Sequence, residues 1–145
     1  MSRDPGIDAA AGELHMTIGL LVRRLRQTRI QGEVTLPEVS ALARLDRGGP
    51  ATAAALAKQE GISPQAMGAT LARLQERGLL DRRPDPGDRR RVVLSVSAAG
   101  AEVLRVRRHA RAEQLARILE SDFTEEERAR LMAAAPLIER LAQGL

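Results

Sequence analysis

The sequence predicts a mainly α-helical protein with one small β-hairpin. Through most of the 145 residues, apolar side chains recur every three or four positions, which is the spacing of one buried helix face. After a turn rich in Pro and Gly, Val92, Leu94 and Val96 alternate instead with Val93 and Ser95, and this pattern is typical of the return strand of a hairpin. The hydrophobic fraction of 43% supports a folded core. The sequence contains one Phe, Phe123, and no Trp or Tyr. We therefore expect closely packed helices with an aliphatic core.

Composition also limits the chemistry of this chain. It has no cysteine, which excludes disulfides, thiol redox sensing and cysteine–zinc sites. No arrangement of nucleophile and base, phosphate-binding glycine loop or cluster of metal ligands is visible, so we expect no enzyme activity, no cofactor and no metal. The first residues lack the apolar run of a targeting or membrane segment, so we expect a cytoplasmic protein without a membrane partner.

Four helices are predicted before the hairpin. The first spans about residues 9 to 31 and ends at Gly32, and we expect residues 1–8 to be frayed. The second begins after Thr35, because Thr35-Leu36-Pro37-Glu38 has the pattern of a capping box. The third covers residues 53–60 after a Thr52 cap, and the fourth follows Ser63 and Pro64 and stops at Gly78. We expect the fourth helix to bury Met67, Thr70, Leu71 and Leu74.

The hairpin and two more helices complete the order. Residues 79–83 and 91–96 are the predicted strands. Ser97 is expected to cap a long helix from residue 98 to about residue 120. A second capping box, Thr124-Glu125-Glu126-Glu127, opens the last helix.

The third and fourth helices, with the tight turn Gly61-Ile62 between them, have the dimensions of a helix-turn-helix. In that motif the second helix enters the major groove of DNA. The candidate DNA-binding residues on it are Ser63, Gln65, Gly68, Ala69 and Arg73. The alternative is an ordinary helical hairpin whose small residues serve packing.

The hairpin carries a cluster of charge at its predicted tip: Asp88, Arg89, Arg90 and Arg91. Arginine inserts favourably into a narrow minor groove. A free Asp88 would repel phosphate, so we expect its carboxylate to accept a hydrogen bond from an arginine or a tip amide and to hold the shape of the loop. The alternative is a solvated charged turn.

Together these segments resemble the MarR family of winged helix-turn-helix regulators. The matching stretches are TAAALAKQEG, ISPQAMGATLARLQERGLLDR and DPGDRRRVVLSVSAAG. The family's hairpin, or wing, reads Asp-x-Arg and then Leu-Thr-x-x-Gly, which here corresponds to Asp88, Arg90, Val96, Ser97 and Gly100. Gly68 and Ala69 stand where many relatives have larger polar residues, and this shifts the expected readout toward the wing and DNA shape.

The resemblance implies a winged helix-turn-helix domain over residues 33–97 and a helical dimerisation region formed by residues 1–32 and 98–145. It implies a homodimer on a pseudo-palindromic operator of double-stranded DNA, acting as a sequence-specific transcriptional regulator. A repressor released by a small lipophilic or phenolic ligand is expected, with His15, Ile18 and Leu42 as candidate ligand-binding residues. The alternatives are a weakly specific architectural DNA-binding protein without an inducer and a protein-interaction module.

Overall fold

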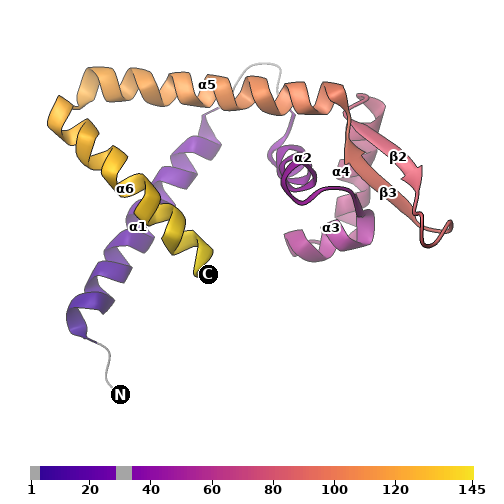
Figure 1. Cartoon of the computed structure of the whole chain (residues 1–145), viewed down its shortest axis with the longest axis horizontal. Coiled ribbons are helices and arrows are strands. Elements are labelled where there is room, and N and C mark those ends of the chain that lie inside the picture. The colour runs from indigo at the N-terminus through magenta and orange to yellow at the C-terminus, as the bar shows by residue number, and fades with distance from the viewer. Residues whose placement is uncertain (1–3, 29–33) are drawn as a thin grey trace. The chain divides into compact units, whose positions relative to one another are not determined.

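A computed structural model describes residues 4–28 and 34–145 (Figure 1). The predicted fold class and the order of four helices, a hairpin and two helices are confirmed. In chain order the elements are α1 (Pro5–Gln27), α2 (Leu36–Gly48), β1 (Ala51–Thr52), α3 (Ala53–Glu60), α4 (Pro64–Glu76), β2 (Leu80–Pro84), β3 (Val92–Val96), α5 (Ala98–Asp122) and α6 (Glu125–Gln143). Contacts divide the chain into two compact units, Met1–Gly100 and Ala101–Leu145.

The sheet of the first unit is antiparallel with the strand order β1-β3-β2. Leu80 lies opposite Val96, and Arg82 lies opposite Leu94. The short strand β1, with Ala51 opposite Leu94, was not predicted, because two residues cannot show an alternating pattern. Figure 1 shows the β2–β3 hairpin extending away from α2, α3 and α4. This hairpin is the wing.

Helices α2, α3 and α4 supply the centre of the core. Leu42, Leu56, Met67 and Leu74 are its largest fully buried side chains, and each contributes about 2 kcal/mol through burial. The buried row predicted for α4 is confirmed: Met67, Thr70, Leu71 and Leu74 are all buried. The sheet adds Leu80 and Leu94 to this core. A single apolar centre therefore positions α4 and the wing.

The corner between β3 and α5 depends on Ser97 and Gly100. The Ser97 hydroxyl donates to the Gly78 carbonyl at 2.7 Å and accepts from the Gly100 amide at 3.1 Å. A Cβ atom on Gly100 would lie 2.2 Å from the Leu79 carbonyl oxygen, so the backbones can pack this closely only because residue 100 is glycine. Ser97 and Gly100, which match the family pattern, therefore have a structural role at this corner.

Helix α1 corrects one prediction. It begins at Pro5 instead of about residue 9, because Asp4 accepts a hydrogen bond from the Gly6 amide at 2.9 Å and Pro5 takes the first helical position. Of the residues expected to be frayed, residues 5–8 are helical, and residues 1–3 lie outside the described residues. The expected stop at Gly32 lies outside the described residues, and the described helix ends at Gln27.

Neither α1 nor α6 contains a buried residue. Among the helices in residues 4–28 and 34–145, none combines the length and the apolar character needed to cross a membrane. Several large apolar side chains of α1, α5 and α6 are instead exposed, including Leu14, Leu21, Ile118, Leu131 and Leu137.

Candidate nucleic-acid interface

The turn between α3 and α4 is held by side-chain caps that the sequence predicted. The Thr52 hydroxyl accepts from the Ala55 amide at 3.2 Å and begins α3. Gly61 has a φ of 65° and ends this helix in the left-handed region, where glycine is favoured. The Ser63 hydroxyl then accepts from the Ala66 amide at 3.1 Å, with Pro64 in the first position of α4. Local chemistry thus sets the starting point of α4.

The face of α4 opposite the core is exposed and carries few large side chains. Its exposed residues include the candidates Gln65, Gly68, Ala69 and Arg73. A Cβ atom on Gly68 would meet nothing within 4 Å, and no positive φ requires glycine there. Glycine in the middle of a helix costs about 0.5–1 kcal/mol relative to alanine, so folding alone gives no reason for Gly68.

Arg73 has a partner that the sequence did not predict. Its Nε atom donates to Glu38 on α2 at 2.9 Å, and Arg77 lies 3.7 Å from the same carboxylate. Burial raises the pKa of Glu38. The hydrogen bonds from the Thr35 amide and Arg73, with the charges of both arginines, outweigh this, and the pKa stays below its usual value. The Arg73 side chain is still 51% exposed, so contact with a phosphate remains a prediction.

A second ion pair joins α2 to α3. Glu60 accepts from the Ser40 hydroxyl at 2.6 Å and pairs with Arg44. The hydrogen bond from Ser40 lowers the pKa of the Glu60 carboxyl most, and the hydrogen bond from Arg44 lowers it further. Glu60 therefore ties α3 to α2, as Glu38 ties α2 to α4, and the lowered pKa of each carboxyl favours its charged form.

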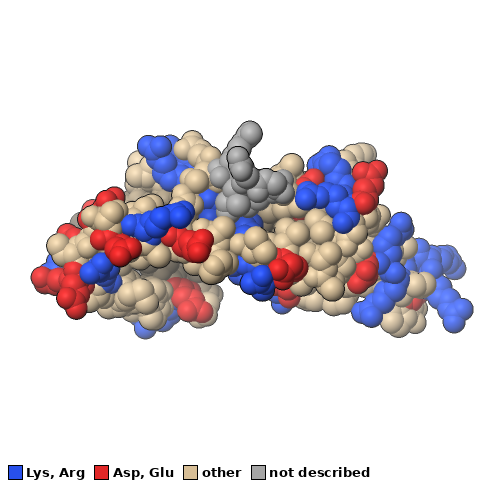
Figure 2. Space-filling view, turned by 90° about the horizontal axis from the view of Figure 1, so that it is seen from above, with Lys and Arg blue, Asp and Glu red and all other residues tan. Residues whose placement is uncertain are grey.

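The wing tip is closed by its own backbone and carboxylates. The Asp88 carboxylate accepts from the Arg90 amide at 3.0 Å, which confirms the expected contact with a tip amide. Asp85 accepts from the Gly87 amide at 2.9 Å, and the Asp85 amide donates to the Arg91 carbonyl, also at 2.9 Å. The arginine side chains stay exposed, and Figure 2 shows basic residues gathered over the wing. The tip therefore presents positive charge on an ordered loop.

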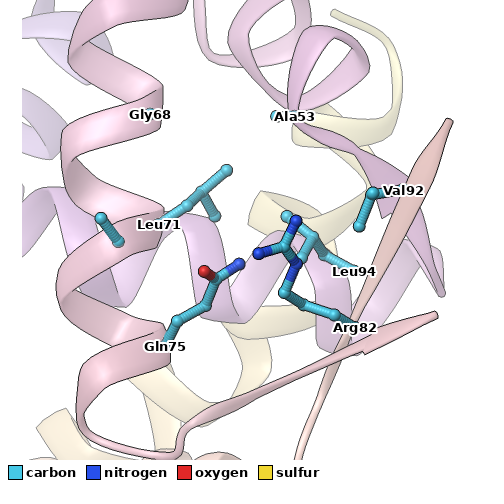
Figure 3. Close-up of a pocket in the computed structure, with 8 residues that line it drawn as sticks. Ala53, Gly68, Leu71, Gln75, Arg82, Val92 and Leu94 are labelled. Carbon is cyan, nitrogen blue, oxygen red and sulfur yellow. The ribbon is translucent and has the colours of Figure 1, made fainter. Parts of the chain in front are cut away.

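A recess of about 190 Å³ separates α4 from the wing. Figure 3 shows Gln75 of α4 and Arg82 of β2 pointing toward one another across it. Sequence reasoning missed both residues. The two-residue alternation of a strand could have separated Arg82 from Arg83, but only the register shows which of them faces α4. The recess is lined by Ala53, Gly68, Leu71, Ala72, Gln75, Arg82, Val92 and Leu94.

A wider hollow lies beside the first, where the start of α3 meets β3. It includes Lys58 and Arg91 among its lining residues. With the wing tip, these residues make a surface whose exposed charges are mostly positive. Such a surface can bind a polyanion.

The candidate ligand-binding residues have different environments. Leu42 is fully buried in the core, with 0% of its surface exposed. Ile18 is half-buried and His15 is exposed, both on α1. Neither of the two hollows near the wing includes any of the three. Their role in binding a ligand stays a prediction.

Comparison with known proteins adds a family and several similar structures. A family model described as MarR family matches residues 33–91. The chain is 40% identical over 105 residues to an uncharacterized HTH-type transcriptional regulator of Mycobacterium leprae, covering 72% of this chain and 73% of that protein. A crystal structure described as a candidate transcriptional regulator from Pseudomonas aeruginosa matches with a TM-score of 0.82 and 30% identity, over 97% of this chain and 98% of that chain.

A MarR mutant from E. coli, complexed with operator DNA, is a more distant structural match. Its TM-score is 0.60 at 22% identity, over 96% of this chain and 99% of that chain. At this identity the likeness concerns the fold.

Proposed function

The chain belongs to the MarR family of HTH-type transcriptional regulators, and on this premise we propose that it binds double-stranded DNA through α4 and the wing. The main observation is that two candidate DNA-binding elements belong to the same compact unit. One is α4, which is capped by Ser63 and has an exposed outer face, and the other is the wing tip, whose arginines lie on a loop ordered by Asp88. The similar E. coli MarR structure, which contains operator DNA, supports the same assignment. In this proposal α4 lies in the major groove and the wing tip in the minor groove.

Two copies of the chain act together in this proposal. The helices of residues 1–32 and 98–145 form the dimerisation region, and residues 33–97 form the DNA-binding domain. The support is the exposed apolar surface of the terminal helices, because neither α1 nor α6 contains a fully buried residue in the single chain. A symmetric dimer would cover such faces and would read a pseudo-palindromic operator with both α4 helices.

We further propose that the protein acts in the cytoplasm as a repressor released by a small lipophilic or phenolic ligand. The support is the resemblance to the family, and His15, Ile18 and Leu42 remain the candidate residues. A thermal shift across a panel of phenolic and fatty acids, each then added to the protein–DNA complex, tests this part. The absence of any shift, together with unchanged DNA binding, would count against ligand control.

The experiment for DNA binding uses the full chain and a duplex that the protein itself selects from a random pool. We expect specific binding to exceed binding to random duplex by more than about 10³-fold. Arg90→Ala should reduce DNA affinity about tenfold or more because a charged contact is lost, while Arg140→Ala removes the same charge from α6 and should not. Sedimentation of both variants checks that the dimer persists.

The same measurement separates the two alternatives. The nearly bare face of α4 favours an architectural, weakly specific DNA-binding protein, which would show a steep salt dependence and little preference for the selected duplex. A protein-interaction module would bind neither duplex. If Arg90→Ala leaves DNA affinity unchanged, the proposed role of the wing is wrong.

A further inference from the structure

Lys58 is the only lysine in the sequence, which uses arginine for every other long cationic side chain. It is therefore the only side chain that carries a primary amine. The guanidinium of arginine cannot lose its proton in proteins, whereas the amine of lysine can, and lysine is a target of acylation. Amine chemistry on the side chains of this protein is thus confined to one position.

The fold holds this amine at the surface. Lys58 lies in the last turn of α3, where its carbonyl accepts from the Gly61 amide at 3.3 Å. The two residues before it, Leu56 and Ala57, are buried, while Lys58 itself is exposed. Among the described residues, none of the ion pairs includes Lys58, so no ion pair has to be broken before the amine reacts.

Lys58 lines the wider hollow, which has a volume of about 700 Å³ and lies where the start of α3 meets β3. Ala54 and Ala55, which also line it, lie one turn before Lys58 on the same side of the helix. Because helical side chains lean toward the N-terminus of their helix, the Lys58 stem lies over short side chains that leave the amine uncovered. An open hollow of this volume can admit a small organic molecule.

A second cation lines the same hollow. Arg91 directly precedes β3, and its side chain is 69% exposed, with Nε 3.9 Å from Asp88. Of the described residues that line the hollow, none is acidic. A cleft with charges of one sign raises the local concentration of an oppositely charged reactant. The hollow is therefore suited to an acyl donor that carries negative charge.

We propose that Lys58 is an acylation site and that its hollow takes a small acyl phosphate as the donor. The Lys58 ammonium first gives one proton to water. Its nitrogen lone pair then attacks the carbonyl carbon of the donor, and the new C–N bond forms as the C–O bond to phosphate breaks. Phosphate leaves with the bonding electrons and takes a second proton from the nitrogen. The product is a neutral amide, so one positive charge is lost.

The lost charge lies beside the wing, because Arg91 and Val92 line the same hollow. Each acylated subunit then attracts the phosphates of DNA less strongly, and affinity for DNA should fall by about threefold. This consequence rests on the proposed function, whereas the reaction at Lys58 does not.

The test incubates the full chain with acetyl phosphate and, in the same solution, a peptide of residues 55–59 blocked at both ends. Mass spectrometry of proteolytic peptides compares acetylation of Lys58 in the folded protein with acetylation of the same lysine in the competitor peptide. We expect Lys58 in the protein to react about tenfold faster at low salt, and this ratio of rates should fall as salt is added.

Arg91→Gln distinguishes a site formed by the hollow from an ordinary exposed lysine. It removes the second cation and should bring the ratio of rates close to one. Arg83→Gln removes the same charge from a wing residue that is not among those lining the hollow, and it should keep the wild-type ratio. Lys58→Arg keeps the positive charge and should show no acetylation at residue 58. Circular dichroism checks that all variants fold.

The effect on DNA is measured with the duplex selected by the wild-type protein. Acetylated wild type should bind it about threefold more weakly than untreated wild type. Lys58→Arg, treated with acetyl phosphate in the same way, should bind as tightly as untreated Lys58→Arg.

Several outcomes would overturn the inference. Equal rates for Lys58 and the competitor peptide, or equal effects of Arg91→Gln and Arg83→Gln, would show that the hollow does not form a site. Acetylated protein that binds the selected duplex as tightly as untreated protein would overturn the consequence for DNA. If wild type binds no duplex, the proposed function fails, while the ratio of rates still tests the acylation site.

Discussion

The buried carboxylate of Glu38 on α2 accepts a hydrogen bond from Nε of Arg73 on α4 at 2.9 Å. Glu38 is 3% exposed, and it also caps its own helix by accepting from the Thr35 amide at 2.9 Å. One carboxylate thus starts α2 and ties it to the middle of α4. The pair restrains the helix that is proposed to enter the major groove.

A double-mutant cycle measures this restraint. Glu38→Gln retains an acceptor for the Thr35 amide and removes the charge, and Arg73→Ala removes the partner. We expect the two changes to couple by about 1–2 kcal/mol in the free energy of unfolding, less than for a fully buried pair because Arg73 is half exposed. Urea denaturation of the four proteins gives the value. Additive effects of the two changes would show that the pair does not stabilise the fold.

The acid stability of the protein should follow Glu38 and Glu60. Both have a pKa below the ordinary value of 4.5 in the folded protein. The unfolded chain therefore binds more protons near this pH, so the stabilisation is complete well above pH 4.5 and is lost as the pH falls through and below it. Urea denaturation at a series of pH values from 7 to 3 should show this loss.

In the double variant Glu38→Gln/Glu60→Gln, the free energy of unfolding should fall less between pH 7 and pH 3 than in wild type. It should also be lower than that of wild type at neutral pH. Glu76→Gln, at the exposed end of α4, is the matched control and should keep the wild-type pH dependence. If the double variant lost as much stability at low pH as wild type, other carboxylates would be responsible for the pH dependence.

Gly100 should not tolerate even one added methyl group. Its Cβ atom would lie 2.2 Å from the Leu79 carbonyl and 2.9 Å from a Val96 methyl carbon, both parts of the corner between β3 and α5. Gly100→Ala should therefore lower the free energy of unfolding by about 3 kcal/mol through overpacking. Urea denaturation measures the loss. A change below about 1 kcal/mol would mean that the corner relaxes readily.

At Gly68 the same substitution to alanine should stabilise the protein, in contrast to its effect at Gly100. Its Cβ atom would meet nothing within 4 Å, so Gly68→Ala should raise the free energy of unfolding by about 0.5–1 kcal/mol. If the glycine serves close approach of DNA, the same variant should bind the selected duplex several-fold more weakly, as measured by fluorescence anisotropy. A variant that is more stable and binds equally well would remove the functional reason for this glycine.

Local signals account for the parts of the interface that the sequence predicted. Thr52 and Ser63 cap their helices through bonds to residues three positions on, so the α3–α4 unit could be derived from residue types and spacing. The Asp88 contact within the wing tip is equally local, only two residues apart.

Long-range pairing explains what the sequence could not show. Glu38 was predicted only as part of a capping box, because its second partner, Arg73, lies 35 residues away. Arg82 was missed because its direction depends on the register of β2 against β3. Strand β1 is too short to show a pattern and exists because β3 is there to pair with it.

Asp88 allows charge and loop geometry to be separated at the wing tip. If the carboxylate acted only as a negative charge near DNA, removing it in any way would tighten binding. Its Oδ1 atom, however, accepts from the Arg90 amide at 3.0 Å and orders the loop that carries the arginines. Asp88→Asn keeps an acceptor without the charge and should bind the selected duplex at least as tightly as wild type.

Asp88→Ala removes both the charge and the acceptor. We expect it to weaken DNA binding about fivefold, the equivalent of one hydrogen bond of about 1 kcal/mol, because the loop must then be ordered on binding. Fluorescence anisotropy at fixed salt compares the two variants with wild type. If Asp88→Asn binds DNA more tightly and Asp88→Ala more weakly than wild type, Asp88 acts by ordering the loop. If both variants bind equally more tightly than wild type, Asp88 acts through its charge alone.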